Sequence, residues 1–325
     1  MRYDTYTVTN EEVDFPIAFS ILTYKDVDQT ERLLRAIYRP QNFYCIHVDL
    51  TSPPVVHKAL RSISQCFGNV FIVSKTEDII YNHMSRLKAD LNCMSDLLSM
   101  SQKWKYLINL PHQDFPLKTN LEMVKILKIY NGANDIEGII SPGRMMSKRF
   151  KRSHKYVNKT WIDMGEKRTK PPYNASIVKG SAYGVFSRQF IHYILKSKEA
   201  EDMLKYMEDV KSPDEYYWAT LNHNKVLKAP GRYLGNPEKK PWNAVYAAWG
   251  GRDRCHGKFI RGVCVFGIGD LNELASKKEL FANKFYSDYQ YLALDCLEEY
   301  IYNRTFNQLV FETFYYNQLP FTIKD

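Results

Sequence analysis

The chain has 325 residues, of which 45% are hydrophobic and 25% are charged, which is typical of a globular protein with a sizeable core. Its net charge of +9 favours an anionic partner. The densest basic stretch, residues 148–155, belongs to no recognisable nucleic-acid-binding module, which argues against nucleic acid and for a small anionic ligand. No run of about 18 apolar residues and no apolar leader segment occurs, so these residues taken alone predict a cytosolic protein.

Strands and helices alternate in the first 130 residues. Short apolar runs predict buried strands at 15–23, 43–48, 69–73 and 105–110. Apolar residues at helical spacing predict helices at 26–38, 56–63, 85–100 and 120–130. This alternation indicates an α/β fold with a mostly parallel sheet and helices on both faces, whose ligands bind beyond the carboxyl ends of the strands. The predicted binding edge carries Thr23, Tyr24, Asp49, the loop after Leu110, and Tyr81.

The second half of the chain has a different pattern. Residues 138–180 are basic and contain scattered Gly, Pro and Asn, which predicts a long irregular loop with a functional role. Helices are then predicted at 187–197, 200–210, 214–221 and 289–304, with a loop-rich crossing at 223–258. Because no repeat or obvious linker occurs, we expect a single domain at 15–310 in two lobes that meet near residue 135, with tails at 1–14 and 311–325.

Residues 212–221, Ser-Pro-Asp-Glu-Tyr-Tyr-Trp-Ala-Thr-Leu, join two adjacent carboxylates to an aromatic run. Pro213 suits the first turn of a helix, with Ser212 as its N-cap. Asp214 and Glu215 then lie where the helix dipole favours ionised carboxylates. A carboxylate shielded by the aromatic rings suits a general base that takes a proton from a hydroxyl. The alternative is that both acids cap a surface helix, which is ordinary at this position.

A few other residues suggest how a nucleotide would be held. Asp26-Val27-Asp28 matches the Asp-x-Asp pattern that binds a divalent metal in many nucleotide-sugar transferases, but it begins a predicted helix, where acids serve as caps. Neither a Walker loop nor Gly-x-Gly-x-x-Gly occurs. A metal-free site that releases a diphosphate needs cationic side chains, for which Arg261 and Lys284 are candidates. A surface position is the alternative for each of the two cations.

The cysteines and glycosylation sequons bear on the compartment. Six cysteines occur without the spacing of a zinc site, so free thiols and disulfides both stay open. Three sequons begin at Asn158, Asn174 and Asn303, which is mild evidence for the secretory pathway.

Many sequence motifs follow one another in a single collinear order. They include residues 15–21, 33–38, 40–49, 86–94, 104–110, 114–120, 180–183, 212–215 and 280–285. Together they span about Phe15 to Glu299, nearly the whole chain. This string of motifs resembles the core-2/I-branching β-1,6-N-acetylglucosaminyltransferase family, also called glycosyltransferase family 14. So many matches in one order make the resemblance highly specific.

The resemblance implies a variant of the nucleotide-sugar-binding GT-A fold, which inverts the anomeric centre and works without a metal. The donor is then UDP-N-acetylglucosamine (UDP-GlcNAc), bound by a nucleotide-binding lobe at about 15–135. Glu215 matches the catalytic base of the family, and Arg261 and Lys284 match the pair that takes the place of a metal on the UDP diphosphate. The uridine and ribose contacts fall on Leu22, Thr23, Tyr24, Asp49, Leu50, Thr51 and Tyr81.

The acceptor site implied by the resemblance lies in a second lobe at about 136–310. Glu137 matches an acceptor-sugar carboxylate and Trp249 a tryptophan that stacks on the acceptor. Arg149 matches the arginine of that site only with a one-residue shift.

Three departures from the family pattern concern the acceptor. Met145 or Met146 stands where the family has a lysine, and Gly251 stands where core-2 enzymes have a tyrosine. Pro111-His112-Gln113 replaces residues that are usually small in the family. The donor and mechanism therefore carry over, whereas the acceptor stays open between core-1, core-3 and lactosamine glycans.

The resemblance also assigns the cysteines. It pairs Cys45 with Cys93 and Cys255 with Cys264. Cys66 and Cys296 match cysteines that bond to a stem in front of the domain. Because this chain contains neither the stem nor a signal anchor, we interpret it as a trimmed or incomplete form of a type II membrane protein of the Golgi lumen rather than a protein with two free thiols.

The expected reaction is transfer of N-acetylglucosamine (GlcNAc) from UDP-GlcNAc to the 6-hydroxyl of an O-glycan on a glycoprotein, as in core-2 branching of Gal-β-1,3-GalNAc. One alternative is a peptide O-xylosyltransferase, which would use UDP-xylose and a Ser-Gly peptide. Another is a non-catalytic glycan-binding relative, which predicts loss of the base or of the cations. Glu215, Arg261 and Lys284 are all present.

Overall fold

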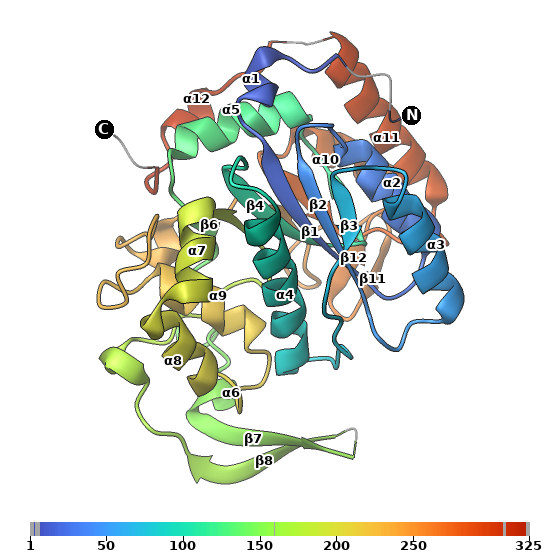
Figure 1. Ribbon diagram of the computed structural model, residues 1–325. Helices are drawn as coiled ribbons and strands as arrows, with labels where there is room; N and C mark the ends of the chain where they lie inside the picture. The colour runs from blue at the N-terminus through green and yellow to red at the C-terminus, as the bar shows by residue number, and fades with distance from the viewer. Residues whose placement is uncertain (1–2, 4–6, 159, 308–309, 323–325) are drawn as a thin grey trace.

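The computed structural model describes residues 3, 7–158, 160–307 and 310–322 (Figure 1). Its central feature is a six-stranded sheet with the strand order β3-β2-β1-β4-β9-β6. The strands are β1 (Ile17–Thr23), β2 (Phe43–Val48), β3 (Val70–Ile72), β4 (Tyr106–Pro111), β6 (Asp135–Ile136) and β9 (Gly184–Ser187). Strands β1 to β4 are parallel, and β9 runs antiparallel to its neighbours β4 and β6. This mainly parallel sheet with its helices confirms the predicted α/β fold class.

Alternate side chains of each central strand pack on opposite faces of the sheet. On one face, Ile17, Phe19 and Ile21 share a core with helices α2, α3 and α5. On the other face, Ala18 and Cys45 share a core with α4 and α7. Because both faces are covered, the strands are apolar at most positions, which explains their long apolar runs, and buried polar residues such as Ser20 and Asn109 are paired with Asp90. These helices are α2 (Val27–Ile37), α3 (Pro54–Ser64), α4 (Met84–Met100), α5 (Asn120–Tyr130) and α7 (Arg188–Lys196).

A smaller sheet lies against the carboxyl end of β4. Its strand order is β10-β13-β5, with β10 (Val245–Tyr246), β13 (Phe281–Asn283) and β5 (Asp114–Pro116). Strands β11 (Lys258–Ile260) and β12 (Val263–Val265) form a separate hairpin. A third core cluster joins residues of β5, β12 and β13 to α10 (Leu271–Ser276) and α11 (Tyr291–Asn307). This arrangement places Arg261 in the β11–β12 turn and Lys284 directly after β13.

Three further helices belong to the second half of the sequence. They are α6 (Lys148–Lys151), α8 (Lys198–Tyr206) and α9 (Asp214–Asn222), and 3-10 turns lie at Pro172–Asn174, Pro237–Lys239 and Ile268–Asp270. Within the described residues, no helix has both the length and the apolar character required to cross a membrane.

The segment 138–180 is not the irregular loop that we predicted. It contains the hairpin of β7 (Arg152–Val157) and β8 (Thr160–Lys167), which projects from the body of the molecule (Figure 1). Aromatic residues of the hairpin contact His83, whose ring centroid lies 5.7 Å from that of Trp161. The exposed charged residues between these aromatic residues hide the alternating strand pattern in the sequence.

The segments expected as tails take part in the fold. Helix α1 (Asn10–Val13) buries Glu12, whose Oε1 accepts a hydrogen bond from Nδ2 of Asn120 at 2.7 Å. After α12 (Phe314–Asn317), the ring of Phe321 is buried in the main core cluster. The described parts of both segments therefore contribute to the compact structure.

Both disulfides implied by the resemblance are present. Cys45–Cys93 joins β2 to α4, and Cys255–Cys264 joins the chain before β11 to β12. Cys66 and Cys296 are free and exposed.

Candidate active site

Glu215 lies in the first turn of α9, and two cations hold its carboxylate. Oε2 of Glu215 is 3.0 Å from Nη1 of Arg149 and 3.0 Å from Nζ of Lys179. The Gly180 N–H donates to the main-chain oxygen of Glu215 at 2.7 Å, so the same segment also fixes the backbone of the helix. The Glu215 side chain is still 27% exposed. The carboxylate is therefore oriented by its partners and accessible to a ligand.

The neighbouring acid, Asp214, is buried. Its Oδ2 accepts a hydrogen bond from Nη1 of Arg86 in α4 at 2.7 Å, and the Arg86 guanidinium lies 4.9 Å from the centroid of the Tyr183 ring. Burial raises the pKa of Asp214 above its usual value, although Arg86 opposes this shift. Asp214 thus anchors α9 to α4, and Glu215 is the acid of this pair that faces outward.

Ser212 does not form the predicted N-cap. Its hydroxyl donates to Oδ1 of Asn82 at 2.8 Å, and its N–H donates to the main-chain oxygen of Asn82 at 2.8 Å. Pro213 precedes the helix without a side-chain cap. The Ser212 bonds therefore fasten the helix that carries Glu215 to the loop that carries Tyr81.

Arg261 and Lys284 lie next to each other, on the β11–β12 turn and after β13. Arg261 and Gly262 have φ values of 53° and 80°, as a two-residue type I′ turn requires. Strand β12 therefore begins at Val263, directly after the turn. Nζ of Lys284 donates to the carbonyl of Ile260 at 3.0 Å. Burial and the nearby Arg261 lower the pKa of Lys284, so an anion bound at this pair would relieve a repulsion between two cations.

The Arg261 turn brings predicted donor and acceptor residues together. The Arg261 guanidinium lies 5.1 Å from the centroid of the exposed Tyr81 ring. On the other side of the turn, the Gly250 N–H donates to the carbonyl of Gly262 at 2.9 Å. The exposed ring of Trp249 lies beside Gly262, where an added Cβ would be 3.9 Å from it.

The predicted nucleoside contacts at 22–24 and 49–51 lie together at the carboxyl ends of β1 and β2. The Asp49 N–H donates to the carbonyl of Thr23 at 2.8 Å. The Asp49 carboxylate accepts from the N–H groups of Thr51 at 2.8 Å and Ile79 at 3.0 Å. Asp49 therefore connects the end of β2 to the loop that leads to Tyr81.

The residues predicted to contact the nucleoside differ in their exposure to solvent. Tyr24 and Leu50 are exposed, whereas Leu22 and Thr23 are buried. The hydroxyl of Thr23 donates to the carbonyl of Lys25 at 3.0 Å. Tyr24, Leu50 and Tyr81 thus offer surfaces for a nucleoside, and the buried pair supports them.

Asp26, the first residue of the Asp-x-Asp pattern, acts as a cap. Its Oδ1 accepts from the Gln29 N–H at 3.0 Å, and its Oδ2 accepts from the hydroxyl of Ser287. Both oxygens are thus engaged within the fold.

Glu137 follows β6 and lies in the same neighbourhood as Glu215. Burial raises the pKa of Glu137, while Lys179, Arg144 and Arg252 oppose the shift. A Cβ added to Gly180 would lie 2.3 Å from the Glu137 carbonyl oxygen, so only glycine allows this approach. The structure therefore brings Glu137, Arg149 and Glu215 into one group, and the sequence prediction missed its fourth member, Lys179.

The position of Lys179 in the sequence gave some signal. It directly precedes the 180–183 motif, which we used to establish the resemblance. Its proximity to Glu137 depends on backbone pairing with Ile139, through hydrogen bonds of 2.7 and 3.1 Å. That pairing crosses the segment predicted as an irregular loop, so its register was not visible in the sequence.

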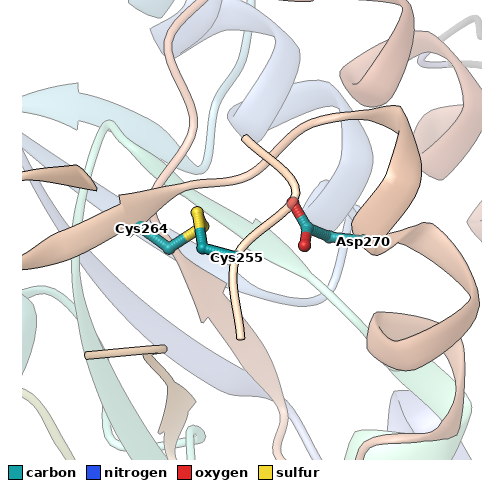
Figure 2. A group of neighbouring side chains, drawn as sticks. All are labelled: Cys255, Cys264 and Asp270. Carbon is teal, nitrogen blue, oxygen red and sulfur yellow. A yellow bond between two sulfur atoms is a disulfide. The ribbon is translucent and has the colours of Figure 1, made fainter. Parts of the chain in front are cut away.

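Cys255, Cys264 and Asp270 form a group whose side chains could suggest a metal site (Figure 2). The two cysteines are bonded to each other, and a disulfide offers no thiolate to a metal. The Asp270 carboxylate accepts from the N–H groups of His256 at 2.8 Å and Gly267 at 2.9 Å. This group stabilises the chain around the β11–β12 hairpin.

His112, in the connection between β4 and β5, is a buried titratable group beside the predicted nucleoside site. Its ring centroid lies 5.2 Å from that of Tyr24, in an edge-to-face arrangement. Burial lowers the pKa of His112 from 6.5 to about 4, so the ring is neutral at pH 7.

The buried neutral state of His112 predicts a loss of stability in acid. Because the unfolded chain binds this proton below pH 6.5 and the folded chain only near pH 4, stability falls as pH decreases through that window. We expect His112→Gln to remove about 3 kcal/mol of this loss. Chemical unfolding at pH 7 and pH 4 measures the difference, and equal losses for variant and wild type would contradict it.

The Glu215 carboxylate and the Arg261–Lys284 pair thus accompany a mainly parallel α/β sheet, a fold whose ligands bind beyond the carboxyl ends of the strands. The family model for the Core-2/I-Branching enzyme matches residues 17–275. A human beta-1,3-galactosyl-O-glycosyl-glycoprotein beta-1,6-N-acetylglucosaminyltransferase is 39% identical over 322 residues, which cover 95% of this chain and 74% of that protein. A human N-acetyllactosaminide beta-1,6-N-acetylglucosaminyl-transferase is 39% identical over 316 residues, which cover 94% and 77%. The chain belongs to the core-2/I-branching enzyme family.

Proposed function

We propose that the protein transfers GlcNAc from UDP-GlcNAc to the 6-hydroxyl of an O-glycan, with inversion and without a metal. The observation that carries the proposal is the arrangement of Glu215. Its carboxylate is held by Arg149 and Lys179, is accessible, and is joined through Ser212 and Asn82 to the loop whose Tyr81 contacts Arg261. The names of the relatives support GlcNAc as the transferred sugar.

The proposed mechanism is a single in-line displacement. Glu215 takes the proton of the acceptor 6-hydroxyl while that oxygen bonds to the anomeric carbon of the donor. The bond from this carbon to the UDP oxygen breaks on the opposite face, which gives a β linkage. Arg261 and Lys284 stabilise the negative charge that develops on the diphosphate.

The substrates are assigned to the surfaces described above. Tyr24, Leu50 and Tyr81 would contact the nucleoside. Asp49 would either hold the loop that leads to Tyr81 or accept a hydrogen bond from a ribose hydroxyl. The acceptor sugar would contact Glu137, Arg149 and Trp249, whose aromatic ring suits the apolar face of a pyranose.

One incubation series tests this proposal. The protein is mixed with UDP-GlcNAc and a panel of core-1, core-3 and lactosamine acceptors, and the products are identified by mass and linkage. A β-1,6-linked GlcNAc on any of them supports the proposal and names the acceptor. Transfer only from UDP-xylose to a Ser-Gly peptide would support the xylosyltransferase alternative, and glycan binding without turnover would support a non-catalytic relative.

Chelation tests the metal-independent part of the mechanism. Because Arg261 and Lys284 are proposed to supply the positive charge at the diphosphate, activity should persist in EDTA at its level without the chelator. The measurement compares initial rates with EDTA and with added manganese. A requirement for manganese would show that the leaving group is stabilised in another way.

The compartment is also a proposal. Two disulfides within the fold suit an oxidising environment, and we propose the secretory pathway, with the Golgi lumen as the site of action.

A further inference from the structure

The two oxygens of the Glu215 carboxylate have different surroundings. Oε2 lies 3.0 Å from both Arg149 and Lys179. Across the part of the chain that the structure describes, no hydrogen bond involves Oε1. Arg149 and Lys179 thus orient the Glu215 carboxylate through Oε2, which leaves Oε1 for a ligand.

The backbone around Lys179 is firmly placed. Its backbone pairs with Ile139 through two hydrogen bonds, and the next residue, Gly180, donates to the backbone of Glu215. The Lys179 side chain is only 14% exposed. The fixed backbone and the low exposure of the side chain place the Lys179 ammonium group beside the Glu215 carboxylate, which helps to orient that carboxylate.

The charges that face Glu215 explain why a cation is needed there. Two other acids lie nearby, Asp214 on the same helix and Glu137 after β6, and each interacts electrostatically with Glu215. Like charges disfavour the ionised form of a carboxylate. Arg86 already pairs with Asp214, which leaves Arg149 and Lys179 to balance Glu215. Tyr216 also interacts electrostatically with Glu215, and its hydroxyl donates to the carbonyl of Met145.

We propose that Lys179 is a positioning residue for the transfer reaction. It holds Oε2 of Glu215, so that Oε1 receives the acceptor proton, and its positive charge offsets the charges of Asp214 and Glu137. This inference rests on the proposed function, in which Glu215 is the base. Lys179 also lies near Glu137, on the acceptor side of the site, so it places the base relative to the acceptor sugar.

The test compares Lys179→Met with Lys179→Arg, and uses Lys196→Met as a control because Lys196 is an exposed lysine at the end of α7. Loss of the cation should move the acid limb of the kcat/KM profile to higher pH by about one unit, which makes the variant about ten-fold slower at pH values below that limb. KM for UDP-GlcNAc should not change. Lys179→Arg should restore most of the rate and the position of the limb, whereas Lys196→Met should match the wild type.

A correctly folded Lys179→Met variant with the wild-type kcat and pH profile would overturn the inference. A second measurement does not require turnover. The Glu215 carboxyl is followed by carbon-13 NMR, assigned by the loss of its signal in Glu215→Gln, and its titration midpoint should rise by about one pH unit in Lys179→Met. An unchanged midpoint would overturn the proposed electrostatic effect of Lys179, whether or not the wild type transfers GlcNAc. A lack of GlcNAc transfer by the wild type would contradict the proposed function instead.

Discussion

Glu215→Gln should lower the rate of GlcNAc transfer by about 10²–10⁴-fold, which is the contribution of a general base. Glutamine keeps the shape of the side chain but cannot accept the proton of the acceptor hydroxyl. The amide can still accept a hydrogen bond from Arg149 or Lys179, so the local structure should persist. UDP affinity should stay close to that of the wild type because Arg261 and Lys284 are unchanged.

The measurement combines initial rates with calorimetric titration of UDP. Glu208→Gln is a suitable control because this exposed glutamate follows α8 and lies outside the group around Glu215. A Glu215→Gln enzyme with nearly full activity would show that another group takes the proton.

Removal of either cation at the Arg261 turn should weaken UDP binding by about 10- to 100-fold, the effect of losing a charge-assisted hydrogen bond. Arg261→Asn is preferred to alanine because asparagine tolerates the positive φ of this turn, so the variant loses the charge and keeps the backbone. Lys284→Met keeps the length of the buried side chain and removes its ammonium group.

Uridine provides the matched ligand because it has no diphosphate. Its affinity, where measurable, should be the same for both variants and the wild type. Arg254→Ala, at an exposed arginine close in sequence to this hairpin, should leave UDP binding unchanged. Wild-type UDP affinity in both cation variants would mean that the diphosphate binds elsewhere.

The sequence predicted the parts of the fold that depend on local pattern. The strand predicted at 43–48 is β2 and the helix predicted at 120–130 is α5. Both were predictable because the spacing of their apolar residues is typical of a buried strand and of a helix. Strands β6 and β9 were missed because they are only two and four residues long and are held by pairing with β4 and with each other. Such pairing depends on residues far apart in the sequence.

In the candidate site, too, some features could be predicted from sequence motifs and others depend on contacts between distant segments. Glu215 and Lys284 were predicted because they lie in the motifs at 212–215 and 280–285, and Arg261 because the resemblance matches it to the other cation of the pair. Their roles in this chain are still predictions. The direction of each side chain was not predictable, since it depends on the burial of Asp214 by Arg86 and on the left-handed turn at Arg261. Lys179 was missed because its contact with Glu215 joins segments that meet only in the folded chain.

The Cys255–Cys264 disulfide encloses the turn that presents Arg261, with a separation of nine residues between the two cysteines. Reduction of this bond would open the short loop while the main sheet, which lies elsewhere, kept its own contacts. A chain made under reducing conditions would then carry Arg261 on an unclosed loop. The oxidation state of these two cysteines would therefore decide how firmly the hairpin holds Arg261 beside Lys284.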